Sequence, residues 1–302
     1  MAGKGDSKRA ILIALAANFA IFVAKSIAAA LTYSGAMLAE AVHSLADCGN
    51  QLLLLLGMKR ALQPPTVDFP LGFGKSIYFW SFLVALLLFS VGGMFSVYEG
   101  LHKLHAPEPL RWPWLAVAVL SFGLVVEAIS LAGCLREVNR ARGTDSLWRW
   151  FRDSRQSELI VIFGEDLAAL FGLALALVAV LLTLATGNPL YDAIGTLSIG
   201  VLLIVIALFV AVEVKALLIG QSADPALGRQ LRAFLSEQPE IGRVFNLITL
   251  QLGTDVMLAA KVQMAADLPV SQAAMQINRV EAAMRSRFPE IRFSFIEPDL
   301  HD

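Results

Sequence analysis

The sequence predicts an all-α membrane domain of six transmembrane helices, followed by a small cytoplasmic α+β domain. Hydrophobic residues make up 57% of the 302 residues and charged residues 16%, whereas soluble domains carry about 25% charged residues. The hydrophobic residues gather before residue 221 in runs that reach the roughly 20 apolar residues of a bilayer-spanning helix. The later chain has the short helix and strand periodicities of a soluble domain. No basic cluster indicates a nucleic-acid partner.

Six segments have the length and composition of membrane-spanning helices. The connections after the first and fifth segments are short, which predicts helical hairpins at both places. Residues 1–9 are expected to form a cytoplasmic tail, residues 10–221 the six-span domain and residues 222–302 the cytoplasmic domain. The predicted spans are 10–31, 36–60, 78–101, 113–135, 158–185 and 190–213.

Basic residues are distributed unevenly between the two sides of this predicted domain. One side carries only Lys103 and Arg111, whereas the other carries the basic residues of the N-terminal tail and of the long loop 136–157. The positive-inside rule therefore places both termini in the cytoplasm, or in the matrix if the membrane is that of an organelle. A bacterial inner membrane is the expected location. Within the long loop, SLWRWFRDSR alternates aromatic residues with arginines, which predicts a short helix lying in the membrane interface.

The last 80 residues predict the element order helix, strand, strand, helix, strand. Helical spacing covers residues 225–238 and 270–288, and strand-forming runs cover residues 244–252, 255–264 and 291–298. Gly253 and Thr254 between the first two strands signal a hairpin. This order suits a ferredoxin-like domain, and a domain this small would bury a larger core by pairing with a second copy.

Four ionisable residues stand out inside predicted spans: His43 and Asp47 in the second, and Glu165 and Asp166 in the fifth. Ionisable groups inside a membrane usually face an aqueous path, and imidazole with carboxylates suits zinc and neighbouring divalent metals. Helical spacing places His43 and Asp47 in one stripe with Glu40 and Gln51, which must point inward. The rise of about 1.5 Å per residue puts Asp47 and Asp166 at similar depth.

Other polar residues accompany this set. Glu127 in the fourth span and Asn18 in the first reach about the same layer and are candidate supporting or proton-coupling groups. Lys25 and Glu40 lie near the outer boundary of adjacent helices, where an ion pair would lower the cost of burying each charge. The alternative for His43 is a neutral packing residue, and Glu165 suits a structural or proton-handling role nearly as well as ligation.

These segments resemble the cation diffusion facilitator family, whose members are six-span divalent-metal transporters with a cytoplasmic ferredoxin-like tail. HSLAD, from His43 to Asp47, is similar to the family's motif on the second span. The resemblance covers nearly the whole chain and is strongest with the branch of mitochondrial zinc transporters and bacterial relatives. The other segments that fit are LGFGKSIYFWSF, VGGMFSVYEGLHKL, GEDLAALFG and LLIGQSADP.

The resemblance implies a homodimeric, proton-coupled antiporter with alternating access and a tetrahedral metal site on the second and fifth spans. His43, Asp47 and Asp166 match that site directly. The usual fourth ligand position holds Ile162, which cannot bind metal, so Glu165 is the first substitute and Glu127 the second. Phe69 stands where relatives often have histidine, so no metal site is expected in that loop. His301 is the one histidine of the tail, so the tail is expected to be a dimerisation module without bound metal.

Zinc is the leading transported ion, although this ligand set discriminates poorly against Fe²⁺, Co²⁺, Ni²⁺, Mn²⁺ or Cd²⁺. No cofactor is expected beyond the transported metal and the counter-transported protons. The first alternative function is a non-transporting membrane metal sensor or scaffold. The second, an intramembrane metallohydrolase, is disfavoured because the chain has no HExxH motif and only four histidines. An enzyme is therefore not expected.

Overall fold

The computed structural model describes residues 4–300, so His301 lies outside the described residues. The chain forms two compact units. The helical unit contains residues 1–56, 80–145 and 158–214, and the tail unit contains residues 215–302 together with the segments 57–79 and 146–157. The tail unit therefore also contains two segments that precede the predicted boundary near residue 221.

Four helices are long and apolar enough to cross a membrane: a continuous helical segment Ser76–His105, α5 (Pro113–Arg142), α7 (Ser157–Thr186) and α8 (Leu190–Ile219). They correspond to the third to sixth predicted spans. The first two predicted spans also form helices, α1 (Lys4–Thr32) and α2 (Gly35–Ala61). In α1 the described apolar part is only Asn18–Thr32, and polar residues interrupt α2, so crossing by these two stays a prediction.

The helical segment that contains the third predicted span is interrupted by a π-helix, which hydropathy did not predict. It consists of α3 (Ser76–Leu87), the π-helix η1 (Leu88–Met94) and α4 (Phe95–His105). A π-helical turn inserts an additional residue and is frequent at functional sites. The insertion leaves the helix continuous but changes which residues of η1 and α4 face their neighbours.

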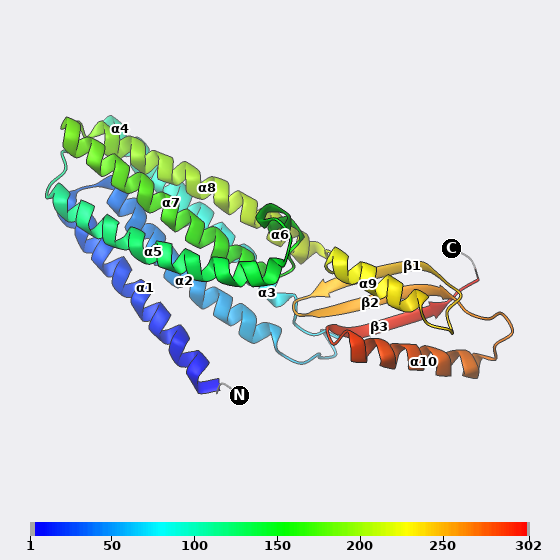
Figure 1. The fold of residues 1–302 in the computed structure, drawn as a ribbon. Helices are drawn as coiled ribbons and strands as arrows, with labels where there is room; N and C mark the ends of the chain where they lie inside the picture. The colour runs from blue at the N-terminus through cyan, green and yellow to red at the C-terminus, as the bar shows by residue number, and fades with distance from the viewer. Residues whose placement is uncertain (1–3, 301–302) are drawn as a thin grey trace. The chain divides into compact units, whose positions relative to one another are not determined.

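Small residues allow the helices of the first unit to pack closely (Figure 1). Its buried core contains residues from α1, α2, η1, α5, α7 and α8, and about half of these core residues are alanines. Glycines bring η1 and α4 against α8: a Cβ on Gly93 would lie 2.6 Å from Ile204, and one on Gly200 would lie 2.6 Å from the Val97 backbone nitrogen. Such small-residue contacts are typical of helices that associate within membranes.

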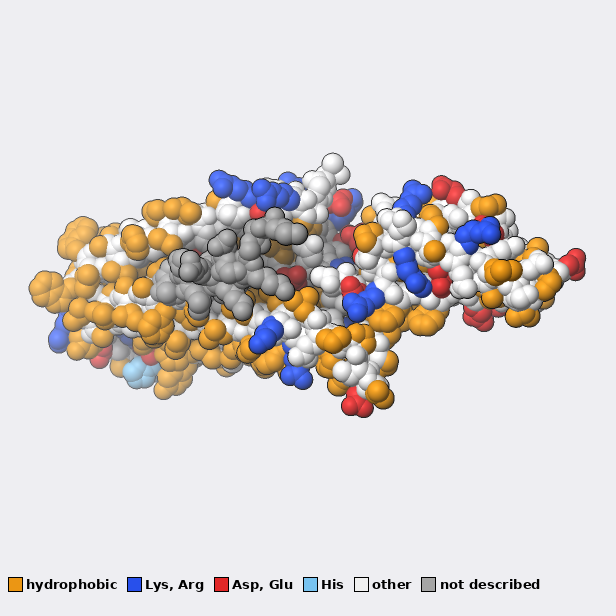
Figure 2. Space-filling view, turned by 90° about the horizontal axis from the view of Figure 1, so that it is seen from below, with side chains coloured by type: hydrophobic (Ala, Val, Ile, Leu, Met, Phe, Trp, Pro, Cys, Tyr) orange, Lys and Arg blue, Asp and Glu red, His pale blue; other side chains and the backbone are white. Residues whose placement is uncertain are grey.

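Large hydrophobic side chains cover much of the visible outer face of the helical unit (Figure 2). Among the described residues of this unit, Phe122, Ile129 and Phe171 are each at least 50% exposed. An exposed apolar surface of this extent marks a protein or membrane contact. Together with the four long apolar helices, it identifies the chain as an integral membrane protein.

The tail unit has the predicted element order. Its elements are α9 (Pro225–Ser236), β1 (Arg243–Leu252), β2 (Asp255–Gln263), α10 (Val270–Arg287) and β3 (Ile291–Pro298). The sheet order is β1-β2-β3, with β1 antiparallel and β3 parallel to β2. The predicted hairpin is confirmed, because Gly253 has φ +73° at the two-residue turn between β1 and β2. Both helices pack their apolar sides on alternate residues of β2.

The short helix predicted in the long loop is present as α6 (Leu147–Asp153), whereas its place in the membrane interface stays a prediction. Ser146 caps its first turn by accepting a hydrogen bond from the Arg149 backbone nitrogen. Trp150 is buried whereas Trp148 is 61% exposed, so α6 has one buried face and one exposed aromatic face.

A close backbone contact joins the hairpin turn to the loop before α3, inside the tail unit. The Gly253 amide donates to the Tyr78 hydroxyl at 2.9 Å. A Cβ on Gly74 would collide with the Leu252 carbonyl, and one on Gly253 would lie 2.7 Å from the Gly74 carbonyl oxygen. Only residues without a Cβ permit this approach, which explains the glycines at positions 74 and 253.

Candidate metal-transport site

The start of α2 is fixed by Asp192 of α8. Its carboxylate accepts hydrogen bonds from the Gly35 backbone nitrogen at 2.6 Å and from the Ser34 hydroxyl at 2.5 Å. Lys103 lies 3.6 Å from the same carboxylate and also donates to the Tyr33 carbonyl. A carboxylate at the N-terminus of a helix stabilises its unpaired N–H groups, so this contact anchors the helix that carries the predicted metal ligands.

A single face of α2 carries the unsatisfied polar atoms of the described chain. Among the described residues, the buried side-chain atoms without a hydrogen-bond partner are Glu40 Oε1, His43 Nδ1 and Nε2, Asp47 Oδ1 and Asn50 Oδ1. Buried polar atoms in folded proteins are nearly always paired. A row of unpaired lone-pair donors therefore indicates a place for a cation, a proton or water.

His43 and Asp47 lie one helical turn apart on this face. The His43 Nε2 and Asp47 Oδ2 atoms are 3.7 Å apart, which is too long for a hydrogen bond. Gly92 of η1 lies beside the imidazole, since a Cβ there would be in ordinary contact with His43 Nδ1 at 3.9 Å. The π-helix thus places a glycine next to the predicted histidine ligand.

The two adjacent acids of α7 have different partners. Glu165 is buried and its Oε1 accepts a hydrogen bond from Asn50 Nδ2 of α2 at 2.5 Å. Asp166 is half-buried and lies 3.4 Å from the Ser130 hydroxyl of α5. The two carboxylates diverge, as the angle of about 100° between successive helical residues requires.

Four carboxyl groups gather around the α2 stripe. Asp47 lies within electrostatic range of Glu165 and Asp166, and Glu127 lies within range of both Asp47 and Asp166. Lys25 is the nearby cation, but it is already paired with a further carboxylate, that of Glu40. Four carboxyl groups therefore share a region that additional cations, either metal ions or protons, would stabilise.

The pair of Lys25 and Glu40 is completely buried. Lys25 Nζ lies 3.1 Å from Glu40 Oε2 and donates to the Ser44 hydroxyl at 2.8 Å. Gly172 of α7 provides room for the carboxylate, since a Cβ there would lie 2.5 Å from Glu40 Oε1. The pair thus holds α1 and α2 together at the outer end of the stripe.

The structure does not assemble the predicted ligands into one closed group. No three His, Cys, Asp or Glu side chains in the described part of the chain lie close enough together to hold a metal ion. The four-ligand set of His43, Asp47, Glu165 and Asp166 stays a prediction. Asn18 of α1 is half-buried. Ile162, at the usual fourth ligand position, is 39% exposed, so it is not part of the buried stripe.

Sequence reasoning missed Asn50. It assigned Gln51 to the inward stripe, but Gln51 is half-buried whereas Asn50 is fully buried. The signal was present, because residues 40, 43, 47 and 50 follow the alternating spacing of three and four that defines one helix face.

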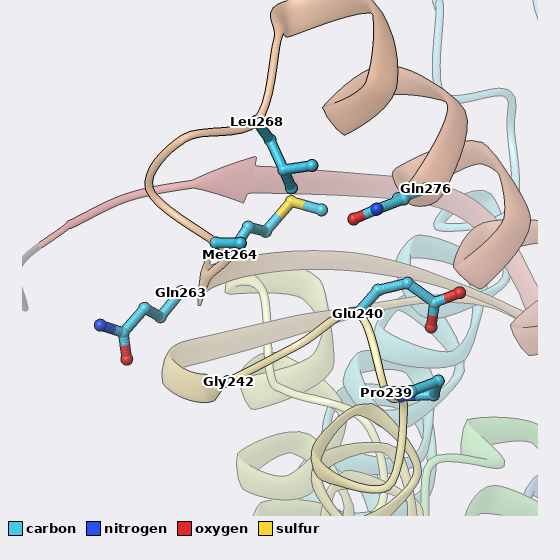
Figure 3. Close-up of a pocket in the computed structure, with 8 residues that line it drawn as sticks. Pro239, Glu240, Gly242, Gln263, Met264, Leu268 and Gln276 are labelled. Carbon is cyan, nitrogen blue, oxygen red and sulfur yellow. The ribbon is translucent and has the colours of Figure 1, made fainter.

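A separate cavity of about 440 Å³ lies in the tail unit (Figure 3). Met264, Leu268 and Gln276 point into it, and the Glu240 carboxylate at its edge pairs with Arg279 at 3.3 Å. Glu240 is the only carboxylate among its described lining residues. This cavity lacks the donor set of a transition-metal site, so the α2 stripe is the candidate site.

A helical membrane protein with a buried row of carboxylate, imidazole and amide groups has the features of an ion transporter. The model of the cation efflux transmembrane domain matches residues 11–219. The chain therefore belongs to the cation efflux family, the cation diffusion facilitators, which are membrane transporters and not enzymes.

Individual relatives extend this likeness. The chain is 33% identical over 253 residues to the mitochondrial proton-coupled zinc antiporter SLC30A9 of Mus musculus, covering 83% of this chain and 44% of that protein. It is 29% identical over 246 residues to metal tolerance protein C4 of Arabidopsis thaliana, covering 80% and 53%. It is 26% identical over 284 residues to the cation-efflux pump FieF of Escherichia fergusonii, covering 93% and 89%. The chain thus spans less than half of the mouse relative and about half of the plant one.

Proposed function

We propose that this protein is a secondary transporter that exports divalent transition-metal cations, foremost Zn²⁺, from the cytoplasm in exchange for protons. The observation that carries the proposal is the stripe of buried, unpartnered donor atoms on α2, opposite the acids of α7. Fixed buried donors with excess negative charge bind cations, and inside a membrane such groups mark an ion pathway.

In this proposal the metal binds to His43, Asp47 and Asp166, with Glu165 as the candidate fourth ligand. Binding requires deprotonated carboxylates and a neutral imidazole, so metal and protons compete for the same atoms. Rearrangement of the helices around the site would expose it to the outer side, where protons displace the metal. Glu127 and Asn18, in neighbouring helices, would support the site or carry a proton.

Zinc is the proposed substrate because a nitrogen-plus-oxygen donor set suits it. The name of the mouse relative, a proton-coupled zinc antiporter, supports both the ion and the counter-ion. Fe²⁺, Co²⁺, Ni²⁺, Mn²⁺ and Cd²⁺ are the competing ions, since geometry and availability decide among them as much as ligand type.

The proposed membrane arrangement has six spans with both termini in the cytoplasm. The 29 residues of α1 and the 27 residues of α2 correspond to about 40 Å of helix at 1.5 Å per residue, enough to cross a bilayer core of roughly 30 Å. A bacterial inner membrane is proposed, and the mitochondrial relative makes an organelle membrane the alternative.

We also propose a homodimer formed through the ferredoxin-like tail. α9 and α10 cover one face of its sheet, and the opposite face presents Ile248, Ala259 and Phe295 in one row across the three strands. Ile248 and Phe295 are 56% and 58% exposed. A second copy of the sheet would cover these side chains.

The experiment that tests the proposed function is zinc uptake by purified full-length protein in liposomes loaded at different internal pH. Flux that follows the proton gradient in the wild type, and falls by more than about tenfold in both Asp47→Ala and Asp166→Ala, is expected. Asp68→Ala, an exposed loop aspartate, is the matched control. A folded wild-type protein that moves no divalent metal would favour the sensor or scaffold alternative.

A further inference from the structure

Asn50 differs from the other residues of the α2 stripe because only one end of its side chain is paired. It is completely buried, and its Nδ2 donates to Glu165 Oε1 at 2.5 Å. Its Oδ1 has no hydrogen-bond partner. A buried amide usually satisfies both ends, so the unpaired oxygen requires an explanation.

The bond to Glu165 fixes which way the amide points. In the structure the nitrogen of Asn50 faces Glu165 and the oxygen, which has no hydrogen-bond partner, faces elsewhere; an ionised carboxylate accepts hydrogen bonds and does not donate them. Turning the amide over would place two oxygen acceptors against each other. The acceptor end of Asn50 is therefore held in one orientation within the stripe.

Asn50 lies on the same face of α2 as the predicted ligands His43 and Asp47. Asn50 follows Asp47 by three residues, which places the two side chains on the same helix face. Asp47 Oδ1 is also buried without a partner. A metal ion bound by Asp47 would thus meet the Asn50 oxygen as a neighbouring donor, whereas Ile162 offers none.

We propose that Asn50, in place of Glu165, is the fourth ligand, and that its amide oxygen determines the metal specificity of this transporter while Glu165 holds the amide in position. This inference rests on the proposed function. The ligands would then be one imidazole nitrogen, two carboxylate oxygens and one amide oxygen. Oxygen-rich sets suit harder ions such as Mn²⁺ better than sets with more imidazole do, so the site should accept Mn²⁺ beside Zn²⁺.

The test measures dissociation constants for Zn²⁺ and Mn²⁺ by calorimetry on the full chain in detergent micelles. Asn50→Leu is expected to raise the Zn²⁺ constant by about tenfold or more. The matched control is Asn139→Leu, because Asn139 is an exposed asparagine on α5, and it should bind as the wild type does. Glu165→Gln keeps an acceptor for the Asn50 amide and should weaken binding less than Asn50→Leu.

Asn50→His provides a second measurement, the preference for Zn²⁺ over Mn²⁺, which would not change if Asn50 had only a structural role. Histidine can still donate an N–H to Glu165, and it replaces an oxygen ligand by a nitrogen ligand. The preference for Zn²⁺ over Mn²⁺ should rise by about tenfold. This variant decides the question even if Asn50→Leu fails to fold.

The measurements distinguish a failure of the Asn50 proposal from a failure of the proposed function. Unchanged Zn²⁺ binding in Asn50→Leu, or an unchanged Zn²⁺ to Mn²⁺ ratio in Asn50→His, would overturn the role of Asn50 while leaving the transporter intact. A wild-type protein that binds and transports no divalent metal would overturn the proposed function and this inference together.

Discussion

Lys25 illustrates how a buried charge is accommodated inside the helical unit. Its Nζ has two partners, Glu40 at 3.1 Å and Ser44 at 2.8 Å, and the pair is inaccessible to solvent. A buried pair adds little stability relative to apolar residues of the same size, but removing one partner leaves an unpaired buried charge. Lys25 and Glu40 should therefore behave as a unit.

Lys25→Met is expected to destabilise the protein by about 3–5 kcal/mol, because it strands the Glu40 carboxylate without a counter-charge. The double variant Lys25→Met with Glu40→Gln should recover most of that loss. Unfolding in detergent micelles, followed for both single variants and the double variant, measures the coupling. Lys215→Met is the control, since Lys215 is exposed on α8. Additive effects of the two single changes would contradict the pairing.

Gly172 makes room for the same carboxylate. Because a Cβ there would lie 2.5 Å from Glu40 Oε1, Gly172→Ala should displace the carboxylate and cost about 1–3 kcal/mol. Gly133 of α5 has no atom within 4 Å of its would-be Cβ, so Gly133→Ala should be neutral or stabilise the helix by up to about 1 kcal/mol. Thermal unfolding of the two variants makes the comparison, and equal stabilities would exclude this role for Gly172.

Among the elements, the hairpin of β1 and β2 contacts the loop before α3 through backbone atoms and contacts α3 through the Tyr78 hydroxyl. The turn at Gly253 approaches Gly74 so closely that neither residue can carry a side chain, and Tyr78 receives the Gly253 amide. Because Tyr78 belongs to α3, this contact ties the tail sheet to the first turn of the helix that continues into η1 and α4.

Gly74→Ala is expected to open this contact, because the new methyl group would collide with the Leu252 carbonyl. The Gly253 amide should then exchange with solvent at least about tenfold faster, corresponding to about 1.4 kcal/mol of local stability. Hydrogen exchange with mass spectrometry measures it. Gly228→Ala in α9, whose would-be Cβ meets no atom within 4 Å, should leave the exchange unchanged. If the Gly253 amide exchanges at the wild-type rate in both variants, the contact with Gly74 is not required to protect that amide.

For the molecule as a whole, the proposed homodimer depends on the open face of the tail sheet. The rows Ile248–Ala259–Phe295 and Leu250–Met257–Phe293 follow the strand register. An apolar sheet face left open to water favours association. The helical unit, by contrast, presents its apolar outer face to lipid.

Ile248→Asp should convert the dimer to monomer in detergent, because it would bury a carboxylate without a partner at the proposed contact. Light scattering on the purified full chain measures the mass of the particle. Val270→Asp is the matched control, because Val270 is 86% exposed at the start of α10, and it should stay dimeric. A dimer that survives Ile248→Asp would place the interface elsewhere.

The sequence by itself determined the class of the chain, because hydrophobic runs and helical periodicity are local properties. It predicted α1 to α8 at nearly their observed places, the αββαβ order of the tail and the hairpin at Gly253. It also placed Lys25 and Glu40 at matching depth on adjacent helices. Its description of His43, Asp47 and Asp166 as metal ligands stays a prediction.

Only the tertiary structure decided which groups of different helices meet. Three contacts join residues that are far apart in the chain: Asn50 with Glu165, Gly172 with Glu40, and Gly74 with Gly253. Helical spacing defines a face, but the rotation of one helix against its neighbour selects Asn50 over Gln51. Those rotations are set by close packing of the whole unit, which no local pattern contains.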